Sequence, residues 1–426
     1  MSWPPLLEKT THLQRRLRAE KRFRWYGKLA VTLSIAVLVM LLSLIGWNAR
    51  TAIYQTVLNV EVSLDPAIID VDEIYKESHN FSDLYKGDLQ APIVAALQKI
   101  IPDAEPRDLQ KLISRGASSD VWQYMQKNPD KLGQTVQLQI PASSDVDMAV
   151  KNGLNRSTPE IDRRLNDIQL SRVESLQSAG VLETIFNWRF FTAGDSREPE
   201  LAGILASLVG SLLTMLVTVL FALPLGIAAA IYLEEFAPKN RFTTIIETNI
   251  NNLAAVPSIV YGLLGLAIFL GFLGMPRSAP LVGGLVLGLM TMPVIIIATR
   301  SSLDAVPPSI REGALALGAS PVQAVFHHIL PLAMPGIMTG TIIGMARALG
   351  ETAPLLMIGM VAFITSTPDG FLNPSSVLPV QIFIWADSAE RGFVEKTAAG
   401  IVLLIIFLLF MNGLALYLRH KFEKKW

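Results

Sequence analysis

Long, uninterrupted apolar runs alternate with polar segments along the chain, and each run is long enough to cross a membrane as a helix. We place six spans at about 28–48, 202–232, 254–273, 279–299, 333–362 and 396–418. Only helices or closed barrels satisfy their backbone polar groups in hydrocarbon, and continuous rather than alternating apolar runs favour helices. The pattern predicts an all-α polytopic membrane protein with six transmembrane helices.

Basic residues gather at both ends of the chain. An even number of spans puts both termini on one side of the membrane, and the positive-inside rule makes that side cytoplasmic. The basic residues are Lys9, Arg15, Arg16, Arg18, Lys21, Arg22, Arg24 and Lys28 near the start and Arg419, Lys421, Lys424 and Lys425 near the end. The first span has a long basic leader and no small-residue cleavage site after it, so we interpret it as a permanent anchor.

These patterns divide the chain into five segments. Residues 1–27 form a basic cytoplasmic segment, 28–48 an anchor helix, and 49–200 an extracytoplasmic insert. Residues 201–418 form a core of five spans, with a cytoplasmic loop at 300–331, and 419–426 form a basic tail. The composition agrees with a membrane location, because 51% of residues are hydrophobic and the net charge is zero. The chain contains no cysteine, which excludes disulfides and thiolate metal sites.

The 49–200 insert is mostly polar and contains amphipathic stretches at 91–101 and 163–176, with turn signals between them. This pattern is typical of a small folded domain. We find no catalytic constellation, metal-ligand spacing or Gly-rich phosphate loop in it, so we expect a scaffold or docking surface and not an enzyme. We interpret His79, near Glu77 and Asp83, as part of a solvated surface rather than a metal site.

The loop between the fourth and fifth spans predicts two short helices separated by a tight turn. Gly318 can adopt the left-handed conformation that ends a helix. Ser320 then supplies an N-cap, with Pro321 at the first helical position and Gln323 at the third, as in a capping box. We expect Pro331 to end the second helix just before the fifth span.

This loop resembles the coupling loop of the permease subunits of ABC importers, which reads Glu-Ala-Ala, three residues, Gly, and Leu-Pro at a fixed later distance. Gly313 replaces the first alanine of that motif, and His328 stands where an aliphatic residue is usual. The resemblance implies that the loop docks into a groove of a separate ATPase subunit. The residues it assigns to coupling are Arg311, Glu312, Gly313, Ala314, Gly318, Leu330 and Pro331.

Further motifs resemble those of the PstA family, the A-type permeases of bacterial phosphate importers. They are Asn252–Leu263, Ala346–Leu355 with its Glu351-Thr352-Ala353-Pro354, and Leu378-Pro379 followed by Ile382–Trp385. The resemblance implies a type I ABC importer permease core in the bacterial inner membrane. It also implies a second, PstC-like permease, a PstB-like ATPase homodimer and a periplasmic, PstS-like phosphate-binding protein as partners.

Arg347 lies well inside the predicted fifth span, close to mid-membrane, where a charge is costly and normally serves a pathway. At about 100° per residue, Gly336, Gly340, Gly344, Arg347 and Glu351 share one stripe roughly 80° wide. Small residues spaced by four let another helix approach closely, so this face is protein-facing. We expect Arg347, Glu351 and the adjacent Thr352 to line a substrate pathway. The alternative is that Arg347 and Glu351 only neutralise each other within the helix.

Other functional classes remain open at this point. A sulfate, molybdate or other anion permease would share the same features. A membrane-anchored sensor with a ligand-binding insert is a further alternative, although it leaves the coupling loop unexplained. The chain has no Gly-x-x-x-x-Gly-Lys-Ser/Thr loop, so we expect no cofactor bound by this chain, with ATP and Mg²⁺ used by the partner ATPase.

Overall fold

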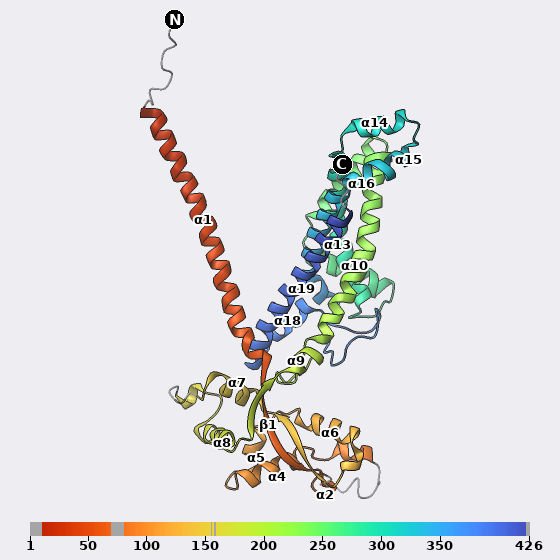
Figure 1. Ribbon diagram of the computed structural model, residues 1–426. Coiled ribbons are helices and arrows are strands. Elements are labelled where there is room, and N and C mark those ends of the chain that lie inside the picture. The colour runs from red at the N-terminus through yellow and green to blue at the C-terminus, as the bar shows by residue number, and fades with distance from the viewer. Residues whose placement is uncertain (1–10, 70–80, 155, 157–158, 423–426) are drawn as a thin grey trace.

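The chain has a helical membrane core and a small folded insert. The computed structural model describes residues 11–69, 81–154, 156 and 159–422 (Figure 1). Glu77 and His79 lie outside the described residues, so the interpretation of their surface stays a prediction. Most of the described chain is helical, as the apolar runs predict. The all-α prediction is wrong for the insert, which contains three paired strands.

Five described helices are long and apolar enough to cross a membrane, and a bent helix pair allows a sixth crossing. The core elements are α1 (Thr11–Ala49), α10 (Leu205–Ile231) with π-helical η5 (Tyr232–Phe236), α11 (Arg241–Ala254), α12 (Ser258–Gly265) with π-helical η6 (Leu266–Phe272), α13 (Pro280–Asp304), α14 (Pro308–Ala316), α15 (Pro321–Ala324), π-helical η7 (Val325–Ile329), α16 (Leu330–Gly350), α17 (Ala353–Met357), α18 (Leu378–Ala386) and α19 (Gly392–Phe422). The predicted spans at 202–232, 279–299 and 396–418 coincide with α10, α13 and α19 to within a few residues, and the predicted span at 28–48 lies within the longer α1.

Helices α11 and α12 form a sharply bent pair. Its two helices meet at 103°, with Pro257 as the N-cap of α12. Ile250 of α11 packs beside Ile296 near the end of α13, whereas Gly265 of α12 faces Val286 near its beginning. The pair therefore contacts α13 at two levels, with α11 nearer the end of α13 and α12 nearer its beginning. The predicted span at 254–273 contains α12 and η6, and α11 ends where this span begins.

The insert is built around an antiparallel sheet in the order β2-β1-β3. On β1, Leu58, Val60 and Val62 alternate towards a buried core that helices cover from one side. The elements are η1 (Arg50–Ile53), β1 (Tyr54–Ser63), α2 (Pro66–Ile69), η2 (Phe81–Lys86), α4 (Ala91–Ile100), α5 (Pro106–Gln110), α6 (Ala117–Lys127), η3 (Pro129–Lys131), β2 (Thr135–Pro141), α7 (Ser144–Asn152), η4 (Glu160–Asp162), α8 (Asp167–Ser178), β3 (Leu182–Phe186) and α9 (Trp188–Thr192).

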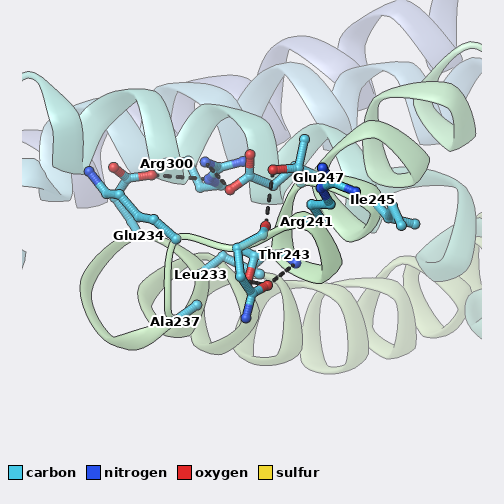
Figure 2. Close-up of a pocket in the computed structure, with 11 residues that line it drawn as sticks. Leu233, Glu234, Ala237, Arg241, Thr243, Ile245, Glu247 and Arg300 are labelled. Atoms are coloured by element: carbon cyan, nitrogen blue, oxygen red, sulfur yellow. Dashed lines mark hydrogen bonds and ion pairs between the residues drawn. The ribbon is translucent and has the colours of Figure 1, made fainter.

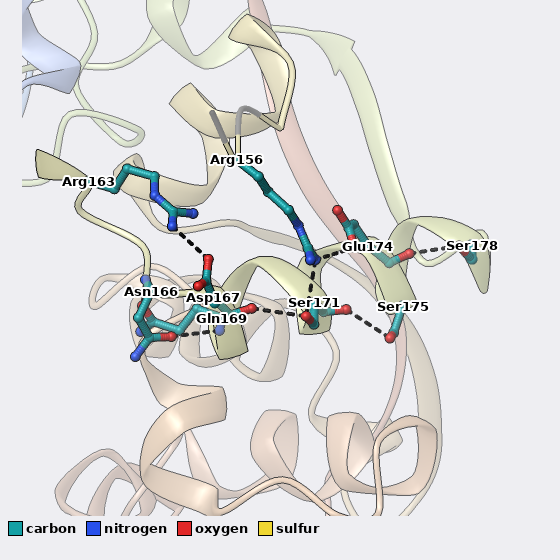
Figure 3. A network of polar contacts seen from close by, with 9 residues as sticks. All are labelled: Arg156, Arg163, Asn166, Asp167, Gln169, Ser171, Glu174, Ser175 and Ser178. Carbon is teal, nitrogen blue, oxygen red and sulfur yellow. Dashed lines mark hydrogen bonds and ion pairs between the residues drawn. The ribbon is translucent and has the colours of Figure 1, made fainter. Parts of the chain in front are cut away.

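The amphipathic stretches predicted in the insert form α4 and α8. Helix α8 begins at Asp167 rather than at Arg163, because a capping box fixes its start (Figure 3). Asn166 Oδ1 accepts from the Gln169 N–H at 2.7 Å, and Gln169 Oε1 accepts from the Asn166 N–H at 3.0 Å. Arg163 instead reaches forward, with its Nη2 2.6 Å from Asp167 Oδ1.

Buried charges join the insert to the first turn of α19. Lys151 Nζ on α7 lies 2.6 Å from Asp147 Oδ2 and 2.8 Å from Glu395 Oε1, and all three side chains are almost fully buried. Burial also raises the pKa of Glu200, just before α10, from 4.5 to about 7, although Ser114 hydrogen bonding opposes the shift. The insert is therefore fixed to the core by polar contacts as well as by the chain itself.

The start of α1, the α14–α15 hairpin and the end of α19 lie at one end of the molecule, and the insert lies at the other (Figure 1). Helix α1 packs on α19 near the insert through Ile45 and Ala49, and Ala52 of η1 joins the same cluster. The loop at 300–331 therefore lies at the same end of the molecule as both ends of the described chain.

Candidate functional site

The loop at 300–331 folds as the predicted helical hairpin. Gly318 has a φ of +90°, the left-handed conformation that ends α14. Ser320 then caps α15: its Oγ accepts from the Gln323 N–H at 3.3 Å, and Gln323 Oε1 accepts from the Ser320 N–H at 2.9 Å. Pro321 occupies the first helical position. The glycine, serine and proline that predict the turn therefore each adopt the expected local geometry.

The hairpin has one buried and one exposed side. Ala314 and Ala324 are buried, and Val325 and Ile329 of η7 pack with Leu303 at the end of α13. Glu312 and Gly313 are exposed. Large apolar side chains also face outwards at Leu315, Leu317, Val322 and Phe326, and Leu317 is 92% exposed. Such a cluster at the tip of a polar hairpin is typical of a surface that another protein covers.

The prediction that Pro331 ends the second helix is wrong. Helix continues from Pro321 through η7 and α16 to Gly350. The N–H of Leu330 donates to the carbonyl of Val325, an i to i−5 bond that widens this turn. A π turn just before Pro331 leaves room for its ring, so the helix passes through the proline without a break.

Ion pairs join α14 and the last turns of α13 to η5, which follows α10, and to α11. Arg311 Nη2 on α14 pairs with Glu235 Oε1 of η5, whose side chain is only 4% exposed. Arg300 Nε lies 3.1 Å from Glu234 Oε2, and Arg300 Nη2 lies 2.9 Å from Glu247 Oε1 (Figure 2). Both arginines therefore bridge separate elements at this end of the core.

A cavity of about 840 Å³ opens beside the Arg300 pairs (Figure 2). Basic and hydroxyl side chains line part of it, including Lys239, Arg241 and Thr244 at the start of α11. Sequence reasoning did not single out Glu247 or this cavity. The adjacent Glu234 and Glu235 at the end of a long apolar run were the available signal, since two carboxylates there need basic partners.

Arg347 lies in the last turn of α16, with Glu351 just beyond it. The predicted continuation of the span to 362 is wrong: α16 ends at Gly350, and Glu351 is extended. Pro354 explains the end, because it has no N–H to donate to the carbonyl of Gly350. Arg347 Nε still lies 3.6 Å from Glu351 Oε1, with the side chains 44% and 21% exposed in this chain. Thr352 is partly exposed beside them.

The glycine stripe on α16 faces α13. A Cβ at Gly340 would lie 2.1 Å from the Cβ of Ala298, so only glycine permits this approach. Farther along, a Cβ at Gly344 would meet Thr291 at 3.9 Å. Because the helices run antiparallel, Arg347 lies about one turn beyond Thr291, nearer the middle of α13 than its end.

Comparison with known proteins identifies the family. A family described as "Binding-protein-dependent transport system inner membrane component" matches residues 222–424. The probable ABC transporter permease protein YqgH of Bacillus subtilis is 33% identical over 218 residues, covering 49% of this chain and 69% of its own. The phosphate transport system permease protein PstA 1 of Mycobacterium tuberculosis is 33% identical over 221 residues, covering 51% of this chain and 71% of its own. The chain belongs to the PstA-type permeases of ABC transporters.

The PstA-type match is confined to the core. PstA of Haemophilus influenzae is 31% identical over 237 residues, covering 54% of this chain and 81% of its own. Residues 10–160 match a domain of unknown function instead. Among solved structures, a chain of the MetNI methionine ABC transporter covers 50% of this chain and 95% of its own, at 16% identity and a TM-score of 0.41. The permease family and the domain of unknown function thus match separate parts of the chain.

Proposed function

We propose that this chain is the transmembrane permease subunit of an ATP-driven phosphate importer in the bacterial inner membrane. The observation that carries the proposal is the punctuated hairpin around Gly318 in a PstA-type core. A sensor with passive anchor helices has no use for such a hairpin. In this function the chain forms half of the translocation pathway and hydrolyses no ATP itself.

The hairpin is the coupling element in this proposal. Its exposed apolar cluster at Leu315, Leu317, Val322 and Phe326 docks into a groove of a PstB-like ATPase homodimer, which uses ATP and Mg²⁺. When the ATPase subunits close, they displace the hairpin. The pair between Arg311 and Glu235 transmits that displacement directly to η5 and hence to α10.

Arg347, Glu351 and Thr352 serve the substrate pathway in the same proposal. A guanidinium offers a fork of donors that matches phosphate oxygens and offsets the cost of moving an anion through a low-dielectric passage. At neutral pH phosphate still carries a proton, which the Glu351 carboxylate can accept as a hydrogen bond. Sulfate has no such proton, so the same carboxylate repels it.

The basic termini give the orientation of the chain. Both termini and the hairpin lie in the cytoplasm, and the insert at 49–200 lies outside the membrane. There the insert acts as a scaffold or docking surface for a periplasmic, PstS-like phosphate-binding protein. A second, PstC-like permease supplies the other half of the pathway.

Uptake measurements test this function. A strain lacking the gene should lose labelled phosphate uptake and regain it from a plasmid copy, while uptake of sulfate and molybdate stays unchanged. Affinity purification of the tagged chain should recover an ATPase and a second permease. Loss of sulfate or molybdate uptake instead would keep the permease function and change the cargo to that anion. Purification of the chain without an ATPase would exclude the importer function.

A further inference from the structure

Helix α11, the first helix of the bent pair, presents different side chains around its circumference. Ile246 and Ile250 pack on the core beside Ile296. Phe242 and Ile245 are exposed and apolar, as expected for a surface in contact with lipid. These residues account for only part of the helix surface.

A polar stripe occupies the remaining face of α11. At about 100° per residue, its members fall within a sector roughly 100° wide. All are exposed in this chain. The stripe consists of Thr244, Thr248, Asn251 and Asn252.

The two asparagines of the stripe are the part that hydrocarbon cannot accommodate. Asn249, on the apolar side, donates its Nδ2 to the carbonyl of Ile245 at 2.8 Å and is thereby satisfied within the helix. Within the described part of the chain, the side chains of Asn251 and Asn252 have no such hydrogen bond. An amide left without a partner in lipid costs several kcal/mol, so these two must face water or a polar ligand.

The stripe runs between a cavity and the surroundings of Arg347. The cavity is lined by Lys239, Arg241 and Arg300 and also by Glu234 and Glu247, whose carboxylates pair with Arg300. Thr244, at the beginning of the stripe, also lines this cavity of about 840 Å³. At its other end α11 meets the break before α12. There the Tyr261 hydroxyl donates to the carbonyl of Leu253 at 2.8 Å and lies within electrostatic reach of Arg347.

We propose that this stripe lines the inner half of an oxyanion pathway, between Arg347 and the cavity beside Arg300. The inference rests on the proposed importer function and adds the ligands that follow Arg347. Each Asn251 and Asn252 amide offers two N–H donors to anionic oxygens and a carbonyl that accepts the proton of a hydrogen phosphate. Neutral donors bind a passing anion weakly enough to release it, which conduction requires.

Cysteine accessibility in the assembled complex tests the proposal, since the chain has no native cysteine. Asn251→Cys and Asn252→Cys should react with the anionic reagent 2-sulfonatoethyl methanethiosulfonate, because thiolates form in water and not in lipid. Inorganic phosphate should slow both reactions several-fold. Asn249→Cys, an exposed asparagine on the other face, is the matched control and should react slowly with or without phosphate.

Two results would overturn the proposal. The first is reaction of Asn251→Cys and Asn252→Cys no faster than that of Asn249→Cys, or without protection by phosphate. The second is efficient crosslinking of either stripe variant to the second permease, which would assign the stripe to the subunit interface. Labelling can be measured in a cysteine variant that no longer transports phosphate. A folding defect in a different variant therefore does not affect this test.

Uptake provides an independent readout. Asn251→Leu combined with Asn252→Leu should lower phosphate uptake about tenfold or more at unchanged complex yield, as expected for lost hydrogen bonds to an anion. Asn249→Leu should transport normally. The unsubstituted complex separates the importer hypothesis from the stripe hypothesis. If the unsubstituted complex moves no phosphate, the proposed cargo is wrong. If it transports phosphate but the cysteine variants are not labelled, or are labelled without protection by phosphate, only the role of the stripe is refuted.

Discussion

Replacing Gly318 with valine tests the coupling hairpin through its backbone alone. A Cβ at Gly318 would meet no atom within 4 Å, so the substitution causes no steric clash with the rest of the chain. The φ of +90° is the difficulty, because an L-residue in the left-handed region costs about 1–2 kcal/mol, and a β-branched one is a more severe outlier. That cost lowers the population of correctly formed hairpin roughly 5- to 30-fold.

The assay compares Gly318→Val with Gly313→Ala in the purified complex and in cells. Gly313 is also exposed, and a Cβ there would meet no atom within 4 Å, but it lies inside α14. Alanine at this position should stabilise the helix by about 1 kcal/mol. We expect Gly318→Val to insert into the membrane normally while ATPase association and phosphate uptake fall at least about fivefold. Gly313→Ala should preserve or improve both.

Equal uptake and equal ATPase association in these two variants would refute the reasoning. Gly318→Asn provides an intermediate case, because asparagine tolerates the left-handed region better than other residues with a Cβ. Its activity should therefore lie between those of the wild type and Gly318→Val. Any other order would mean that the backbone conformation of the turn does not control docking.

Other substitutions test the pathway and the insert. Arg347→Ala should abolish phosphate uptake with complex yield preserved, while Glu351→Gln should relax discrimination against sulfate more than it lowers phosphate flux. Poor assembly of both, rescued by combining the two, would support a simple ion pair. Lys151→Met should destabilise the insert junction by about 3–5 kcal/mol, measured by thermal unfolding, because it leaves Glu395 buried without its partner. The raised pKa of Glu200 means that the native state binds this proton more tightly than the unfolded chain does. The contribution of this group to stability is fully present below pH 4.5 and is lost as the pH rises to about 7, by roughly 3 kcal/mol. Glu200→Gln should therefore raise the Tm at pH 8 and leave it nearly unchanged at pH 4.5; equal shifts at both would contradict this account.

Local signals in the sequence predicted the parts of the fold that depend on neighbouring residues. The hairpin turn follows from Gly318, Ser320 and Pro321, whose conformational preferences are intrinsic. The long apolar runs predicted the helices α1, α10, α13 and α19, because a backbone inside hydrocarbon must form its hydrogen bonds internally, as a helix does. Such features need no knowledge of tertiary contacts.

The errors arose where distant contacts or backbone adjustments decide the structure. Pro331 does not interrupt its helix because the π turn before it makes room. The sheet of the insert depends on pairing Leu58 with Ile140, a contact across many residues that the amphipathic helices on either side obscured. The ion partners of Arg300 also come from two separate elements, so no spacing in the sequence predicts Glu247.

The two interruptions in the core, which sequence reasoning did not predict as such, supply the strongest structural reason for a pathway near Arg347. Helix α16 ends at Gly350, level with the interior of α13, and α12 begins after the break at Pro257. The segments that follow these breaks are in contact, since a Cβ at Gly262 would lie 2.7 Å from the Cα of Pro354. Non-helical backbone within a membrane is tolerated only where protein or water satisfies its polar groups. Two breaks that meet beside one arginine therefore require a region shielded from lipid, and an anion crossing the membrane requires the same protection.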